Sequence, residues 1–259
     1  MGYLFEHSWE NERERLAAIE GGLDGSSIAC LNAIGVAPGW RCLEVGAGAG
    51  SIARWLCERV TSTGAVVATD LETSFLEKLE ASNLEVRCHD ISSDPLEEGA
   101  FDLVHARKVL EHLPKPEPAL ERRYRATKHG GWFPLRTQTS FLSCMPIRPI
   151  RGFIQRAYGA FVRCMVANGY RADLGLGLGD ALRRLGLREV QVRGWTSEWT
   201  GAGPGPSVFL RTFEKIRDQV IARGEVSTTD ADRFLDEIRS PEFRAITAVH
   251  FAAWGQRPF

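Results

Sequence analysis

The sequence predicts an α/β fold: a doubly wound, mostly parallel sheet with helices on both faces and with helical cap insertions. Two observations favour this class. Between residues 36 and 139, short apolar runs alternate with segments of helical periodicity, which is the pattern of successive strand–helix–strand units. After residue 139 the alternation stops and an aromatic-rich stretch follows, so an insertion is expected there. With 259 residues, the chain has the length of one enlarged domain.

The composition excludes several classes of protein. Hydrophobic residues make up 44% and charged residues 25% of the chain, as in folded globular proteins. The net charge is -1, so no basic field gathers nucleic acid or an anionic membrane. The N-terminal residues are dense in Glu and Arg, and no apolar run is long enough to span a membrane. We therefore expect a cytoplasmic monomer or homodimer with neither a nucleic-acid nor a membrane partner.

The six cysteines are scattered and predict no metal site. They form no Cys-x-x-Cys pair and no Cys/His spacing typical of tetrahedral zinc. We interpret them as small core residues in a reducing compartment.

The N-terminal region, residues 1–35, is predicted to be a helical lid. Residues 9–19 have the spacing of an amphipathic helix with a charged outer face. Glycines between residues 21 and 25 are expected to end that helix. A second helix would then be capped by Ser26 or Ser27 and run to Ala33.

The core is predicted to comprise residues 36–139, 172–196 and 241–259, with caps at 140–171 and 197–240. Strands are expected at 41–45, 65–69, 84–88, 101–105, 132–138, 187–195 and 243–254, and helices at 51–60, 74–81, 118–127, 174–185, 208–222 and 228–238. Pro134 has no backbone N–H, so we expect it at a position of the fifth strand where no hydrogen bond to a neighbouring strand is needed. Aromatic residues of the caps are interpreted as a mixture of cap core and pocket lining.

A glycine loop stands between the first predicted strand and the following helix. It contains Gly46, Gly48 and Gly50, and glycines at such a turn let a ligand approach the backbone. The loop departs from the dinucleotide pattern G-x-G-x-x-G, whose third glycine would fall at Ser51. A tight turn without a ligand is the alternative.

Acidic residues end the next two predicted strands. Asp70 lies about twenty residues beyond the loop, where a carboxylate accepts hydrogen bonds from ribose hydroxyls. Asp90, followed by Ile91, suits the amine and the face of an adenine. As alternatives, Asp70 would cap a helix starting near Thr73, and Asp90 would merely begin the loop 92–94.

In these motifs the sequence resembles the Rossmann-like, class I S-adenosyl-methionine-dependent methyltransferases, in particular a bacterial small-molecule branch. The likeness covers residues 36–137 and a C-terminal stretch, and its motifs are Glu44-Val45-Gly46-Ala47-Gly48-Ala49-Gly50, Asp70, Asp90-Ile91, Phe101-Asp102-Leu103-Val104, Leu110-Glu111-His112-Leu113, Gly130-Gly131-Trp132 and His250-Phe251-Ala252-Ala253-Trp254-Gly255. The resemblance implies a seven-stranded sheet whose last strand is antiparallel. It also implies cofactor contacts at Glu44, Gly46, Ala47, Gly48, Gly50, Asp70, Leu71, Asp90, Ile91 and Arg107.

One segment departs from the family. Where relatives place a Pro-Gly-Gly turn and a strand rich in Val, Ile and acidic residues, this chain has Lys128-His129-Gly130-Gly131 and then Pro134, Arg136 and Gln138. Substrate contacts of the family are therefore not transferred to the fifth strand.

The expected activity is methyl transfer from S-adenosyl-methionine to a small organic acceptor at oxygen or nitrogen, with S-adenosyl-homocysteine as product. The alternatives are a non-methylating reaction such as a cyclisation or isomerisation, and a non-catalytic binding subunit.

His112 is the first candidate for a general base and His7 the second, because a free imidazole titrates near neutral pH. A histidine packed over Pro114 is the competing interpretation of His112. Likewise, Arg107 would either flank the cofactor or pair with Asp102 or Glu111.

Overall fold

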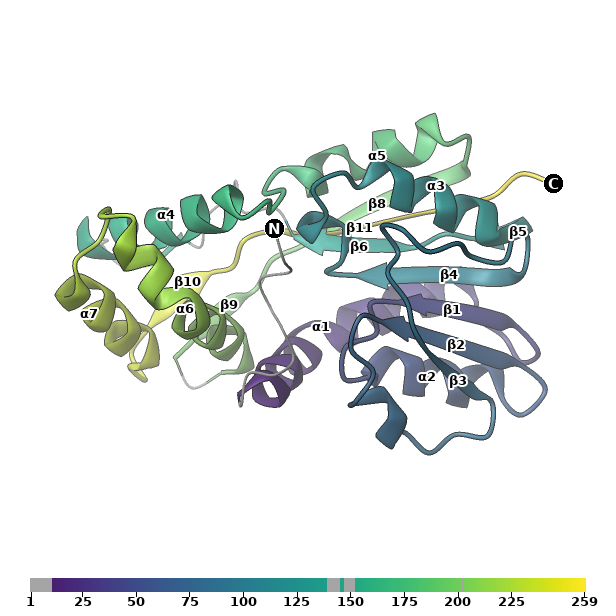
Figure 1. Ribbon diagram of the computed structural model, residues 1–259, viewed down its shortest axis with the longest axis horizontal. Coiled ribbons are helices and arrows are strands. Elements are labelled where there is room, and N and C mark those ends of the chain that lie inside the picture. The colour runs from purple at the N-terminus through teal and green to yellow at the C-terminus, as the bar shows by residue number, and fades with distance from the viewer. Residues whose placement is uncertain (1–10, 139–144, 147–151, 202) are drawn as a thin grey trace.

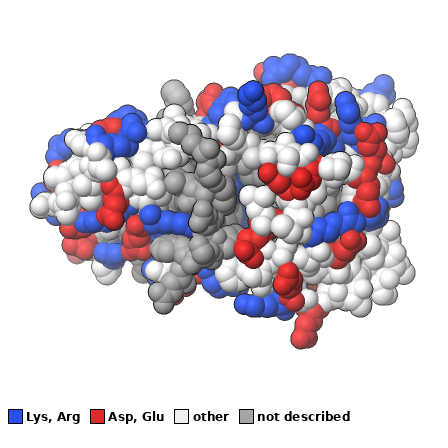
Figure 2. Space-filling model, in the orientation of Figure 1, with Lys and Arg blue, Asp and Glu red and all other residues white. Residues whose placement is uncertain are grey.

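The computed structural model describes residues 11–138, 145–146, 152–201 and 203–259. A central sheet carries helices on both faces, and a smaller helical lobe lies beside it (Figure 1). This arrangement confirms the predicted α/β class. In the view of Figure 2, Lys and Arg side chains are interspersed with Asp and Glu side chains. In the described part of the chain, no helix has the length and apolarity that crossing a membrane requires.

The sheet is mostly parallel, as expected. Its strands are β1 (Arg41–Val45), β2 (Ala65–Asp70), β3 (Leu84–Cys88), β4 (Phe101–Arg107), β5 (Thr127–Trp132), β6 (Leu135–Gln138), β8 (Arg188–Trp195) and β11 (His250–Gln256). Strands β3, β2, β1 and β4 pair in parallel in that order, and β5 and β6 both follow β4. The last strand, β11, runs antiparallel between β6 and β8, as the resemblance implies.

The expected fifth strand is wrong in its bounds, because the chain forms two strands there. β5 already begins at Thr127 and contains a bulge, and β6 begins after Pro134. Pro134 has no N–H for the ladder. Its carbonyl accepts a hydrogen bond from Arg123 Nη2 at 3.0 Å, and the Phe133 N–H donates to the Gly255 carbonyl at 2.9 Å. The described sheet therefore has eight strands, one more than the seven that the resemblance implies.

Each face of the sheet has its own apolar core. On one face, α1 (Glu12–Ile34) and α2 (Ser51–Val60) bury residues such as Leu31 and Leu56 against β1 and β2. On the other, α3 (Glu117–Ala126) and α5 (Leu174–Arg184) cover β4, β6 and β11. A two-sided core accounts for the continuous burial along β1 and β2.

The N-terminal helix differs from the prediction, since α1 is continuous through the glycines that were expected to break it. Gly22 and Gly25 each cost about 1 kcal/mol in a helix relative to alanine. Packing against α2 and against α6 (Pro204–Ala222) outweighs that cost. The helix ends at Gly35, which adopts a left-handed conformation with φ of 85°.

The prediction of a helix at residues 74–81 is also wrong. Only a 3-10 turn, η1 (Leu76–Lys78), forms there. Polar side chains compete with the helical ladder: the Glu72 carboxylate accepts from the Ser74 N–H at 3.0 Å, and the Thr73 hydroxyl donates to Glu77 at 2.5 Å.

The smaller lobe contains α4 (Gly152–Ala167), α6 and α7 (Thr228–Arg239), with the short strands β7 (Met145–Pro146), β9 (Glu198–Thr200) and β10 (Arg244–Ile246). Its core is aromatic, and Phe213 and Phe234 are almost completely buried in it. The expected strand at 243–254 is divided: β10 belongs to this lobe and β11 to the main sheet. Thr247 lies between these two strands, and its N–H donates a hydrogen bond to the Ser197 carbonyl.

Candidate functional site

The glycine loop follows β1 and needs glycine at three positions. Gly46, Gly48 and Gly50 have φ values of 66°, 60° and 89°, a region that disfavours side chains. A Cβ on Gly46 would also collide with Val109. The Gly48 N–H donates to Asp70 Oδ2 at 2.7 Å, so Asp70 holds the loop in place.

A cavity of about 150 Å³ opens between this loop and α1, at the carboxyl ends of the parallel strands. Ligands of open parallel sheets bind at this edge. The structure brings eight of the predicted cofactor residues together around it, namely Gly46, Ala47, Gly48, Asp70, Leu71, Asp90, Ile91 and Arg107. Glu44 and Gly50 lie outside its described lining.

Asp70 presents a half-buried carboxylate to the cavity. Beyond the Gly48 bond, Asp70 Oδ1 accepts from the Glu72 N–H at 3.4 Å. No α-helix begins near Thr73, so capping such a helix is not what Asp70 does here. The neighbouring Leu71 exposes 51% of its surface, an apolar face next to the acceptor oxygens.

Asp90 begins the loop after β3 and also lines the cavity. Its Oδ1 accepts from the Ser92 N–H at 2.8 Å, which closes the loop after β3, and the residue also lines the cavity. His89 lines the cavity too, and its buried Nδ1 has no hydrogen-bond partner in the described part of the chain. Sequence reasoning missed His89, although its place directly before Asp90 at the end of β3 was a usable signal.

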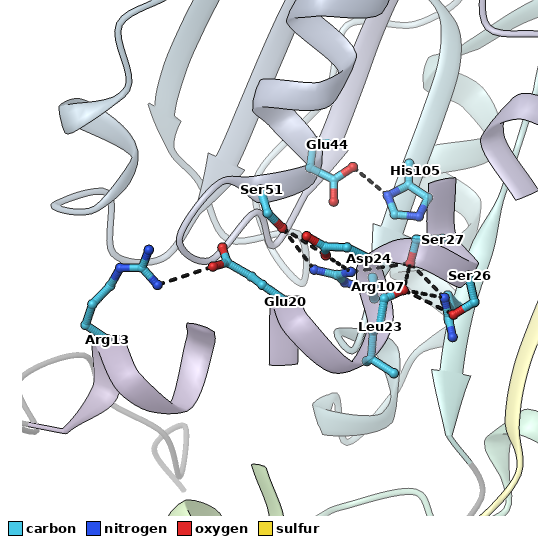
Figure 3. A network of polar contacts seen from close by, with 11 residues as sticks. Arg13, Glu20, Leu23, Asp24, Ser26, Ser27, Glu44, Ser51, His105 and Arg107 are labelled. Atoms are coloured by element: carbon cyan, nitrogen blue, oxygen red, sulfur yellow. Dashed lines mark hydrogen bonds and ion pairs between the residues drawn. The ribbon is translucent and has the colours of Figure 1, made fainter. Parts of the chain in front are cut away.

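The Glu44 side chain contacts His105 rather than the cavity. Its carboxylate and the ring of His105 are both buried, with Glu44 Oε2 and His105 Nδ1 2.5 Å apart (Figure 3). The two residues face each other in the register of β1 and β4. The contact ties the two central strands together behind the glycine loop.

Arg107, at the end of β4, connects the sheet to α1. Its Nη1 lies 2.6 Å from Asp24 Oδ1 and 3.3 Å from Ser27 Oγ (Figure 3). The alternative interpretation, in which Arg107 pairs with Asp102 or Glu111, is wrong. Asp102 forms an ion pair with Lys128, and Glu111 forms one with Lys108. The sequence offered no signal for a partner 83 residues away on α1.

A second cavity, of about 310 Å³, adjoins the first and lies between α1, the end of the sheet and the smaller lobe. Aromatic side chains form much of its wall: Tyr158, Phe161, Tyr170, Trp195, Trp199 and Phe209. Arg15, Ile19, Lys108 and His112 line both cavities. Lys108 has a φ of 59°, a strained value for a residue with a side chain, at the boundary between them.

His112 lies in the 3-10 turn η2 (Leu110–His112), and its ring centroid is 5.4 Å from that of Tyr170. Burial lowers the pKa of His112 to about 4. The expectation of a pKa near neutrality is therefore wrong, and the ring is uncharged at neutral pH. His7, the second candidate base, lies outside the described residues.

A methyltransferase domain family matches residues 43–135, from within β1 to the start of β6. Over these residues the chain is similar to a methyltransferase domain.

Two curated relatives are similar to part of this chain. A ubiquinone biosynthesis O-methyltransferase of Paracidovorax citrulli is 35% identical over 105 residues, which cover 38% of this chain and 44% of that protein. An uncharacterized 37.1 kDa protein in transposon TN4556 of Streptomyces fradiae is 30% identical over 138 residues, or 50% of this chain and 40% of that protein. The chain thus spans less than half the length of these relatives.

The methyltransferase fold extends beyond the matched domain. Phosphoethanolamine N-methyltransferase 2 of Haemonchus contortus, solved with phosphomonomethylethanolamine and S-adenosylhomocysteine, aligns over 100% of this chain and 61% of its own, with a TM-score of 0.63 and 17% identity. At this identity the match shows a shared fold.

Proposed function

We propose that this chain transfers a methyl group from S-adenosyl-methionine to a small organic acceptor. The observation that carries the proposal is the pair of adjoining cavities with a common wall. One is bounded by the glycine loop and two acidic residues, and the other by aromatic side chains. Two ligands held there would meet at Arg15, Ile19, Lys108 and His112.

The residues of the smaller cavity fit S-adenosyl-methionine. Asp70 would accept hydrogen bonds from ribose hydroxyls, and the apolar Leu71 and Ile91 would face the base. The unpartnered Nδ1 of His89 offers one more polar contact. When bound, S-adenosyl-methionine supplies a methyl group on a sulfonium, which is both an electrophile and a leaving group.

Because such a reagent needs little activation, the chain's main task is to orient the acceptor and exclude water. We propose that α1 and the smaller lobe act as a lid over the carboxyl ends of the strands. His112 remains our candidate proton acceptor for an oxygen nucleophile, since its neutral ring lines both cavities. A pKa of about 4 makes it a weak base, so we assign most of the rate enhancement to positioning.

Titration calorimetry tests the cofactor, and product analysis tests the transfer. We expect micromolar binding of S-adenosyl-methionine and S-adenosyl-homocysteine, and no comparable binding of NAD. With labelled S-adenosyl-methionine and a panel of small aromatic phenols and amines, label should appear in an acceptor. Binding of NAD without binding of S-adenosyl-methionine would refute the proposal. Cofactor binding without transfer to any acceptor class would favour a non-methylating reaction.

A further inference from the structure

Arg136 occupies the part of β6 where the sequence departs from the family, and it lines the larger cavity. The side chain is buried, with 4% of the residue exposed. Its Nη1 donates to the Leu23 carbonyl at 2.9 Å and to the Ser27 hydroxyl at 2.8 Å, both on α1. Arg136 thus places a guanidinium group beneath α1, at the floor of the aromatic cavity.

The positive charge of Arg136 has no carboxylate of its own among the described residues. Asp24, on the facing turn of α1, is bonded to Arg107 at 2.6 Å. Arg107 and Arg136 also share the Ser27 hydroxyl. Two buried guanidinium groups are therefore served by a single carboxylate, which leaves one positive charge unbalanced.

The donors of Arg136 are also incompletely used. Among the described residues its buried Nε has no hydrogen-bond partner, and both hydrogen bonds of its head group come from Nη1. Burial lowers the pKa of Arg136 to about 10, with a further contribution from the positive charge of Arg107, so the group stays charged at neutral pH. Binding the Leu23 carbonyl and the Ser27 hydroxyl alone would need only a neutral donor, and a buried charge without a counter-ion is unfavourable.

The wall of this cavity combines aromatic, aliphatic, small polar and cationic side chains. Its described lining contains no Asp or Glu side chain. The other two cations that line it already have carboxylate partners, since Arg15 pairs with Glu12 and Lys108 with Glu111. The Trp195 ring lies 5.3 Å from the Arg136 guanidinium, so an aromatic surface and an unbalanced positive charge adjoin.

We propose that the methyl acceptor is an aromatic carboxylic acid, whose carboxylate pairs with Arg136 while its ring lies among the aromatic side chains of the larger cavity. This inference rests on the proposed function and names its substrate class. A carboxylate matches the planar donor set of a guanidinium and supplies the missing negative charge. A cationic amine would be repelled from the same floor.

The test compares two probes of equal shape, 2-naphthoate and 2-naphthamide, by titration calorimetry with S-adenosyl-homocysteine present at saturation. We expect wild-type protein to bind the acid roughly ten- to a hundredfold more tightly than the amide, as for a charge-assisted hydrogen-bonded pair. In Arg136→Gln the ratio should fall to about one. Arg193→Gln, which removes an exposed arginine outside both cavities, should keep the wild-type ratio.

Ser27→Ala separates this role from a structural one, because it removes a bond between Arg136 and α1 but keeps the charge. We expect it to retain the preference for the acid. Equal affinities for the two probes in wild-type protein would overturn the inference even if Arg136→Gln does not fold. A preference that survives in folded Arg136→Gln would overturn it as well. Failure of the proposed function is a separate result, since S-adenosyl-homocysteine would then not bind.

Discussion

Replacing Asp70 by alanine is expected to weaken cofactor binding strongly and to lower stability only slightly. The carboxylate lines the smaller cavity and also accepts a hydrogen bond from the Gly48 N–H at 2.7 Å. Alanine removes both the ribose acceptor and the support of the glycine loop. Asp70→Asn keeps one oxygen for Gly48 but loses the charge, so it should have an intermediate effect.

The magnitudes follow from the number and kind of bonds. Losing charge-assisted bonds to ribose hydroxyls costs about 1 to 3 kcal/mol, which raises Kd roughly five- to 150-fold. Losing the acceptor for one partly buried backbone N–H costs about 1 kcal/mol of folding free energy. The effect on binding should therefore exceed the effect on stability.

Calorimetric titration with S-adenosyl-homocysteine measures the first quantity, and urea denaturation the second. Asp180→Ala is a suitable control, since Asp180 is exposed on α5 and pairs only with Arg183 among the described residues. If folded Asp70→Ala binds the cofactor as tightly as the control, Asp70 only stabilises the loop and its assignment to the ribose is refuted.

Three further predictions concern other parts of the molecule. Gly46→Ala should reduce cofactor affinity at least tenfold, because the new Cβ would collide with Val109 and the φ of 66° disfavours a side chain. Calorimetry should show that adding Val109→Ala partly restores the affinity. Equal affinities of Gly46→Ala and wild-type protein would contradict the steric argument. The pKa of His112 is about 4 in the fold and about 6.5 when unperturbed, so the unfolded chain takes up the proton first and stability should fall as pH drops from about 6.5 towards 4. His112→Gln should lose less stability over that interval, and equal losses in urea titrations would refute this. Phe213→Ala should cost about 3 to 5 kcal/mol, because the ring is fully buried in the smaller lobe; a loss below about 1 kcal/mol would show that the lobe repacks freely.

Local patterns predicted the elements whose stability is decided locally. The buried strands β1 and β2 and the glycine loop were recognised because apolar runs and glycine spacing are direct consequences of their environment. Helix α1 was misjudged for the opposite reason. The glycines that weaken it are local, whereas its packing against α2 and α6 depends on residues far away in the chain.

The same distinction holds at the site. Residues that end successive parallel strands, such as Asp70 and Asp90, share one edge by topology, so their meeting at one cavity was predictable. The pairing of Arg107 with Asp24 joins segments that no periodicity connects. The lowered pKa of His112 depends on burial by several elements at once, which the local sequence does not encode.

The continuous α1 has a consequence for how ligands associate with the protein. Its residues Arg15 and Ile19 contribute to both cavities, and the same helix packs against α6. Any displacement of α1 by one ligand therefore changes the site of the other. Thermodynamic reciprocity then requires that each ligand alter the affinity of the other by the same factor, so α1 would couple the binding of the two ligands.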